Sequence, residues 1–347
     1  MCDLLRRANA HPISQHTARS TGHVDLETRL QHARIEKRPA PPGVFATIAV
    51  AASALVASPW PAALPAAFDA WIWQGPRLSP AAVAGPLARF LGGVPGVDPA
   101  ISEAVAGWGE RGDLTSLAGL FVPSLLAGAD AAGFAALGTR PAVAVGAAPA
   151  AVLALLMLLL GVVGVMAFKT LLARTMTGSP LRAPGVGREI LGNAGRYAAV
   201  LLLGLGAMLS VAVAAGVIAA VAGFAGVDLL PLLTLLLSAA VMAGAVLVSF
   251  VAEAIVVARS GPVAAVRLSA RVVSANLLPT LGLLLATWLA LFSLPQLFAP
   301  IGGNPAGLAL AILVHAFVAA ALALARLQFF ADRYEATGDR RQATSRR

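Results

Sequence analysis

Long apolar runs alternate with shorter polar segments along most of the chain. Each run is long enough for a helix to cross a hydrocarbon core of about 30 Å. The six runs are residues 43–64, 148–168, 198–225, 232–251, 277–298 and 307–327. The pattern predicts an all-α polytopic membrane protein with six transmembrane helices and with basic amphipathic helices at the membrane surface.

The first run, residues 43–64, is the least hydrophobic because most of its residues are alanine. Trp60, Trp71 and Trp73 lie at and beyond its end, where tryptophans form an aromatic belt at a membrane interface. A cleaved signal sequence is the alternative interpretation of this run, since it is rich in small residues.

Residues 252–276, between the fourth and fifth runs, have the pattern of a basic amphipathic helix. Pro262 follows a glycine, and proline is favoured at the first helical position. In a helix that begins there, Arg267, Arg271 and Ser274 fall in one narrow stripe, while aliphatic side chains cover most of the remaining circumference. We expect this helix to lie along the membrane surface.

Residues 65–140 form the one sizeable polar region between runs, with six acidic residues, four arginines and repeated proline and glycine. Ser79-Pro80 and Asp98-Pro99 each resemble a helix cap followed by proline at the first helical position. A third short helix, broken at Pro123, is expected within residues 114–126. The acidic residues are scattered at spacings that favour a solvated face over a cation or acid/base site, and four of them are Glu103, Glu110, Asp113 and Asp130.

Composition and charge fit a membrane protein. Hydrophobic residues make up 59% of the 347 positions and charged residues 12%, which excludes an ordinary soluble domain. The formal net charge is +9, but no interleaved aromatic residues or reader motif accompany the arginines. This pattern argues against a nucleic-acid partner and favours anionic lipid at the cytoplasmic face.

The positions of the basic residues predict how the chain is threaded. With both termini in the cytoplasm, all but four of the 25 Lys and Arg residues fall on the inner side. The positive-inside rule selects this orientation in a bacterial cell membrane, with residues 65–140 facing outward. The cytoplasmic parts are then residues 1–42, which are expected to be disordered, 169–197, 252–276 and the basic tail 328–347.

Two ionisable residues lie in or near the runs, where charge is costly. Glu253 follows the fourth run, and its expected partners are Arg267, Arg271 or Lys169. A structural ion pair that fixes the amphipathic helix is favoured over contact with a substrate or ion. His315 lies deep in the sixth run, where a neutral histidine bonded to a carbonyl or hydroxyl group is favoured over a proton relay.

Several classes of chemistry lack a matching pattern. Cys2 is the sole cysteine, and its spacing from the four N-terminal histidines, His11, His16, His23 and His32, matches no zinc site. The aqueous regions hold no nucleophile beside a base and no glycine-rich phosphate loop. We therefore expect no catalytic residues, cofactor or metal, and an enzyme is not predicted.

Small residues and a repeat bear on packing and function. Residues spaced four apart allow close helix approach, as in Ala212, Gly216 and Ala220 of the third run and in Ala239 with Ala243 of the fourth. We expect these residues to support packing of the helical bundle. Residues 148–225 and 232–298 also share one order of features, and such repeats favour a transporter modestly.

The order of features around Glu253 resembles that of bacterial multi-pass proteins grouped as the membrane domain of glycerophosphoryl diester phosphodiesterases. The matching residues are Ile255 to Val257, Gly261, Ala264 to Ser269 and Arg271. The resemblance covers residues 232–298, and it implies fold and membrane placement. It does not carry over phosphodiesterase activity, and Arg259-Ser260 stands where those relatives often have an acidic residue.

Three functions follow in order of preference. The first is a non-catalytic integral membrane protein that serves as a scaffold, an accessory subunit with a membrane-protein partner, or a lipid-interacting protein. The second is a transporter or permease-like component that uses His315 and Glu253. The third is a membrane enzyme acting on lipid, which the absence of a polar constellation disfavours.

Overall fold

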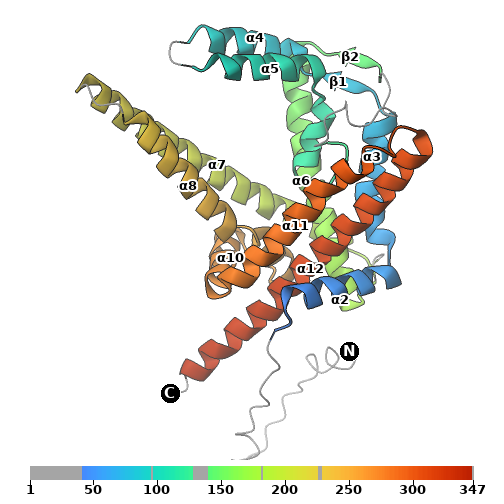
Figure 1. The fold of residues 1–347 in the computed structure, drawn as a ribbon. Coiled ribbons are helices and arrows are strands. Elements are labelled where there is room, and N and C mark those ends of the chain that lie inside the picture. The colour runs from blue at the N-terminus through green and yellow to red at the C-terminus, as the bar shows by residue number, and fades with distance from the viewer. Residues whose placement is uncertain (1–40, 95–96, 128–139, 181–182, 226–228, 346–347) are drawn as a thin grey trace, which may run out of the picture. The chain divides into compact units, whose positions relative to one another are not determined.

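A computed structural model describes residues 41–94, 97–127, 140–180, 183–225 and 229–345, with backbone only at residue 230 and residues 337–345. The expected disorder of residues 1–42, together with Cys2 and the four N-terminal histidines, falls outside the described residues except for positions 41 and 42. The described chain is almost entirely helical (Figure 1). Its strands, β1 (Arg77–Ser79) and β2 (Ala142–Ala144), form one short parallel pair.

Five helical segments are long and apolar enough to cross a membrane, which confirms the all-α membrane class. They are α6 (Ala147–Thr177), α7 (Val186–Phe224), α8 (Leu230–Leu247) with α9 (Val251–Val257), α11 (Leu277–Phe298) and α12 (Pro305–Ser345).

The first apolar run is not the straight span predicted for residues 43–64. It folds as α2 (Val44–Ala57), the 3-10 helix η2 (Trp60–Ala62) and α3 (Ala63–Gln74), with a 92° bend between the two parts. Pro59 explains the bend, because proline disfavours a helical conformation at Ser58 and lacks an N–H donor. The structure reaches six spans only if this bent pair is one span.

Several helices extend beyond the predicted spans. Helix α6 continues through Lys169 and ends at Gly178, a left-handed C-cap with φ of 62°, and α7 begins only eight residues later at Val186. Most of the predicted loop 169–197 is therefore helical. Residues 328–345 of the predicted tail also continue α12, because Phe329 and Phe330 are buried and extend the packed face of that helix.

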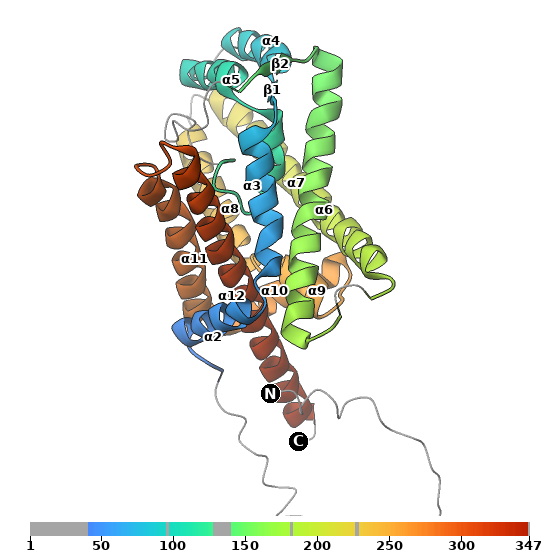
Figure 2. The ribbon, with the colours of Figure 1, turned by 90° about the vertical axis from the view of Figure 1, so that its right-hand side faces the viewer.

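Helix α12 lies at the centre of the packed elements and contacts α2, α3, α6, α9 and α11. Figure 2 shows α3, α6, α11 and α12 running alongside one another. Ala51 and Leu55 of α2 are buried in the same apolar cluster as Met166 of α6 and Leu324 of α12. The first apolar run is thus packed into the core formed by the later helices.

The polar region folds into short helices at the end of the bundle opposite α10 (Figure 1). They are α4 (Ala81–Gly92), α5 (Pro99–Arg111) and η3 (Leu114–Leu120). The predicted start of α5 is found, and Asp98 caps this helix by accepting a hydrogen bond from Ala100 N at 2.9 Å. Helix α4 begins one residue later than predicted, with Pro80 as its N-cap and Ser79 in β1. The third segment is a 3-10 helix that ends at Leu120, before the predicted break at Pro123.

Helix α10 (Pro262–Ala275) begins at the predicted proline, with Gly261 as its N-cap. Ala265, Ser269 and Val272 are buried, while Arg267 and Ser274 are exposed and Arg271 is half-buried. The helix therefore has the predicted amphipathic character, with its basic stripe turned away from the packed side.

Helices α7 and α8 expose apolar side chains along most of their length. The buried residues of α7 are Asn193 and Ala194, both near its N-terminal end, and the most apolar 18-residue window of α7 holds no buried residue. The small residues expected to support bundle packing are exposed on these helices, including Ala212, Gly216 and Ala239. That packing prediction is wrong within this chain, because these faces have no protein neighbour among the described residues.

Candidate functional site

The strongest polar centre lies where three helices meet around Glu253 of α9, whose side chain is 0% exposed. Lys169 of α6 places Nζ 2.5 Å from Oε1 of Glu253, and Arg326 of α12 places Nε 3.0 Å from the same oxygen. One carboxylate therefore joins α6, α9 and α12. We call Glu253, Lys169 and Arg326 the charged triad.

The charged triad lies beside the break between α8 and α9. Helical hydrogen bonding is irregular at Val248, Ser249 and Phe250, so backbone groups are left for other partners. Arg326 Nη2 donates to the carbonyl oxygen of Ser249, and its guanidinium lies 5.5 Å from the centre of the Phe250 ring. Arg326 thus stabilises both the carboxylate and the broken backbone.

Helix α10 is fastened to the same break by Ser269. Its hydroxyl group donates to the Leu247 carbonyl oxygen at 2.7 Å and accepts from the Phe250 N–H at 3.0 Å. Ser269 is fully buried, so both backbone groups would lose their partner in an apolar surrounding without it. Ser269, at the centre of the basic helix, therefore holds α10 against the turn between α8 and α9 through two hydrogen bonds.

Replacing Ser269 with alanine is expected to lower the free energy of unfolding by about 1–3 kcal/mol, because it leaves a buried donor and a buried acceptor unpaired. Ser274→Ala is the matched control, since Ser274 is exposed on the same helix and bonds only the Arg271 carbonyl oxygen. Its effect should stay within about 0.5 kcal/mol. Unfolding of the purified protein in mild detergent measures the change in free energy for both variants. Equal changes would contradict the structural role of the Ser269 hydrogen bonds.

The structure revises the predicted partners of Glu253. Lys169 is confirmed, whereas the described ion pairs of Glu253 do not include Arg267 or Arg271. These arginines lie on the outward stripe of α10, because the apolar face and Ser269 occupy the side that packs. Arg326 was missed as a partner, although its position one turn before the buried Phe329 and Phe330 places it on a packed helix.

Two polar atoms of the centre have no hydrogen-bond partner among the described residues. They are Oε2 of Glu253 and Oγ of Ser249, both buried and one helical turn apart in sequence. The centre also carries two cations against one carboxylate, giving it a formal charge of +1. This arrangement joins helices strongly, and it also leaves two acceptor-capable oxygens beside two cationic side chains.

A second polar centre lies around Asp69 of α3, which is 0% exposed. One carboxylate oxygen accepts from the Ser124 hydroxyl and from Leu126 N at 3.1 Å, and the other accepts from Leu125 N at 2.9 Å. The carboxylate therefore caps the turn at residues 124–126. The sequence analysis does not identify Asp69, because the polar composition of residues 65–140 predicts helices at the membrane surface. In the structure, α3 packs against α12 instead.

His315 faces this second centre. It is 2% exposed, and its Nδ1 lies 3.9 Å from Oδ2 of Asp69, too far for a hydrogen bond. Nδ1 has no hydrogen-bond partner among the described residues, so the expected bond to a carbonyl or hydroxyl group is not found at this atom. The structure thus places His315 next to a carboxylate that was absent from the sequence prediction.

Asp113 corrects the prediction of a solvated acidic face. It is buried, accepts from Leu78 N at 3.1 Å and Thr115 N at 3.0 Å, and pairs with Arg140 at 2.5 Å. These bonds hold β1, η3 and the segment before β2 together. Glu103 and Glu110 are exposed as predicted, and Asp130 lies outside the described residues.

Comparisons with protein-family models, with curated proteins and with solved structures gave no match. Within the described residues, no group of three or more His, Cys, Asp or Glu side chains is placed to hold a metal ion. The two buried centres and the exposed faces of the helices are therefore the features that bear on function.

Proposed function

We propose that this chain is a non-catalytic integral membrane protein that acts as a scaffold or accessory subunit, binding a partner membrane protein through α7 and α8. The observation that carries the proposal is the exposed small-residue face of these helices. A Cβ built at Gly216 meets no atom within 4 Å, and Ala212 and Ala220 on the same face are exposed.

This face is suited to helix association in lipid. Association inside a bilayer gains little from hydrophobicity, because lipid tails are already apolar, and depends on close packing of backbones. Small residues four apart provide that close approach, yet none of the helices that the structure describes packs on this face. A second transmembrane helix, from a partner or from another copy, fits the surface better than lipid alone.

The buried charges support the non-catalytic part of the proposal. Glu253 and Asp113 each accept hydrogen bonds or ion pairs from at least two separate elements, and Asp69 of α3 accepts three hydrogen bonds from the turn at residues 124–126. Each carboxylate therefore has a structural task. A general acid or base needs freedom to exchange its proton with a substrate. Carboxylates engaged in cross-links between elements are poorly suited to that task.

Membrane placement follows from the same proposal. We place the chain in a bacterial cell membrane with both termini in the cytoplasm and with anionic lipid against Arg267 and Arg271. Figure 1 supports this orientation, because α10, α2 and the C-terminal part of α12 lie at the end of the bundle opposite α4 and α5. Exposed arginines at that end would meet lipid headgroups of the inner leaflet. The resemblance to the phosphodiesterase membrane domain remains a prediction.

The partner surface can be tested with a photo-reactive amino acid at Leu209, which is exposed and lies near Gly216 around the helix. Irradiation of intact cells should give a discrete protein adduct. Gly216→Leu should reduce that adduct severalfold without lowering abundance, because the chain itself has open space there. Ala214→Leu, on the opposite face, is the control.

A lipid-only surface would give no protein adduct with the probe at Leu209, and that result would overturn the proposal. An adduct that both leucine variants reduce equally would also contradict it, since the contact would then not depend on the small-residue face. A probe at Leu156 of α6, which is similarly exposed, reports the background of random encounters.

A transporter is the second candidate, and one observation favours it. The span formed by α8 and α9 is broken at residues 248–250, beside the charged triad and two buried oxygens without hydrogen-bond partners. Broken spans with ionisable groups near the break are common in transporters. A variant with all three charges of the triad replaced by apolar side chains tests whether these charges have a role beyond joining helices.

A further inference from the structure

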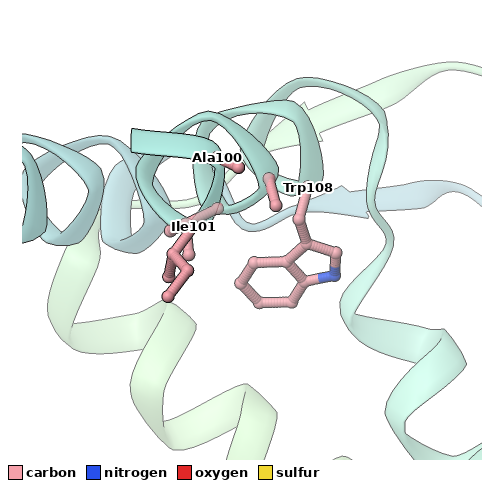
Figure 3. A pocket seen from close by; sticks show the side chains of 5 residues that line it. Ala100, Ile101 and Trp108 are labelled. Atoms are coloured by element: carbon pink, nitrogen blue, oxygen red, sulfur yellow. The ribbon is translucent and has the colours of Figure 1, made fainter. Parts of the chain in front are cut away.

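We propose that α4 and α5 form a paddle that docks on the outer leaflet of the membrane, with one face of α5 inserted among the lipids. The face consists of five residues, Ala100, Ile101, Ala104, Val105 and Trp108. They line a shallow apolar depression of about 420 Å³ (Figure 3).

The five residues share one side of α5 because their spacing follows the helical repeat. Ile101 is 51% exposed and Trp108 is 38% exposed, although both are large apolar side chains. The acidic residues of the helix, Glu103 and Glu110, are exposed elsewhere on its circumference. Helix α5 is therefore amphipathic, with an apolar side that none of the described residues covers.

The remaining side of α5 is occupied by α4, which fixes the direction of the apolar face. Gly109 of α5 lies so close to Ala84 of α4 that an added Cβ would be 2.8 Å from the Ala84 Cβ. The two helices are thus locked as a hairpin. Figure 3 shows Ile101 and Trp108 pointing to the side of the hairpin along which α6 descends.

The occupant is a lipid surface because the patch is directed toward the side on which α6, a helix long and apolar enough to span a membrane, descends (Figure 3). Helix α4 packs on α6, whose first turns expose Val152, Leu155 and Leu156. The apolar face of α5, directed toward α6, would therefore meet the bilayer and not the aqueous phase. Trp108 suits this depth, since tryptophan is enriched at membrane interfaces, and Phe90 and Leu87 of α4 add exposed apolar area.

Spin labels test this inference in the full chain, with Cys2 first replaced by serine so that introduced cysteines are the only thiols. Ile101→Cys and Ala104→Cys report on the apolar face, and Glu103→Cys and Glu110→Cys are matched controls on the same helix. The labelled protein is placed in vesicles of phosphatidylethanolamine and phosphatidylglycerol. Collision rates with oxygen and with a water-soluble nickel chelate are then measured.

Lipid docking predicts an oxygen-to-nickel collision ratio severalfold higher at positions 101 and 104 than at positions 103 and 110. Equal access of nickel to both pairs would show that the face is solvated and would overturn the proposal. Low access of both reagents at positions 101 and 104 would show protein cover, which also overturns it.

Tryptophan fluorescence of the protein without spin labels checks that the labels themselves do not alter how α5 docks. Lipids brominated near the headgroup should quench part of the tryptophan fluorescence, and Trp108→Phe should lower the quenched component while the other four tryptophans keep their contributions. An unchanged quenched component would contradict the docking of Trp108. This result is independent of the partner surface on α7 and α8, so either proposal can fail without the other.

Discussion

Replacing Glu253 with alanine is expected to reduce the amount of folded protein severalfold, before any effect on partner binding can be measured. The change leaves Lys169 and Arg326 buried without their shared carboxylate, with side chains only 11% and 21% exposed. Removing one member of a buried ion pair costs about 3–5 kcal/mol, which is a large part of the stability of a typical protein. Abundance in the membrane and unfolding in detergent measure the loss.

Two variants make this expectation specific. Glu103→Ala removes an exposed glutamate and should leave abundance unchanged. Lys169→Met/Glu253→Leu/Arg326→Met replaces all three charges with apolar side chains and should recover much of the lost stability, because buried ion pairs are often replaceable by apolar groups. Recovery should be incomplete, since the Ser249 carbonyl loses the hydrogen bond from Arg326.

The triple variant also tests whether the charged triad does more than join helices. A scaffold should keep its photo-adduct at Leu209 once abundance has recovered, because the charges serve only to join helices. If the adduct persists in the triple variant, the charged triad has no part in partner binding. A folded variant that loses the adduct would assign the charges to function, and normal abundance of Glu253→Ala would refute their structural role.

Local signals in the sequence are sufficient to predict where a helix begins and which of its faces points outward. Pro262 and Asp98 set the starts of α10 and α5, because proline and a capping side chain act on neighbouring backbone groups. The outward position of Arg267 followed from helical periodicity alone. The bend at Pro59 also has a local cause, but hydropathy alone predicts one straight helix for residues 43–64.

The pairing of distant charges could not be predicted in the same way. Lys169 and Arg326 are separated by 157 positions, and hydropathy placed both at the ends of spans, where basic residues are usual. Their meeting at Glu253 depends on how α6, α9 and α12 pack. Asp69 was likewise hidden, because its partners are two backbone amides and a hydroxyl group that the fold brings together.

Replacing Asp69 with alanine is expected to destabilise the opposite end of the bundle by about 3 kcal/mol or more. The change leaves the Ser124 hydroxyl and the amides of Leu125 and Leu126 without their acceptor, and both leucines are buried. Each buried donor left unpaired costs about 1–3 kcal/mol. Hydrogen exchange at the two amides should accelerate strongly, whereas exchange at buried Val272 of α10 should change least.

Asp98→Ala supplies the matched comparison, because Asp98 also caps a backbone amide but is exposed. Its loss should cost about 1 kcal/mol and leave exchange at Leu125 unchanged. Asp69→Asn should fall between the two aspartate-to-alanine variants, since an amide keeps one acceptor oxygen and turns an N–H group toward a backbone donor. Slow exchange at Leu125 and Leu126 in Asp69→Ala would mean that packing alone holds the turn, and the second centre would then be free for a role involving His315.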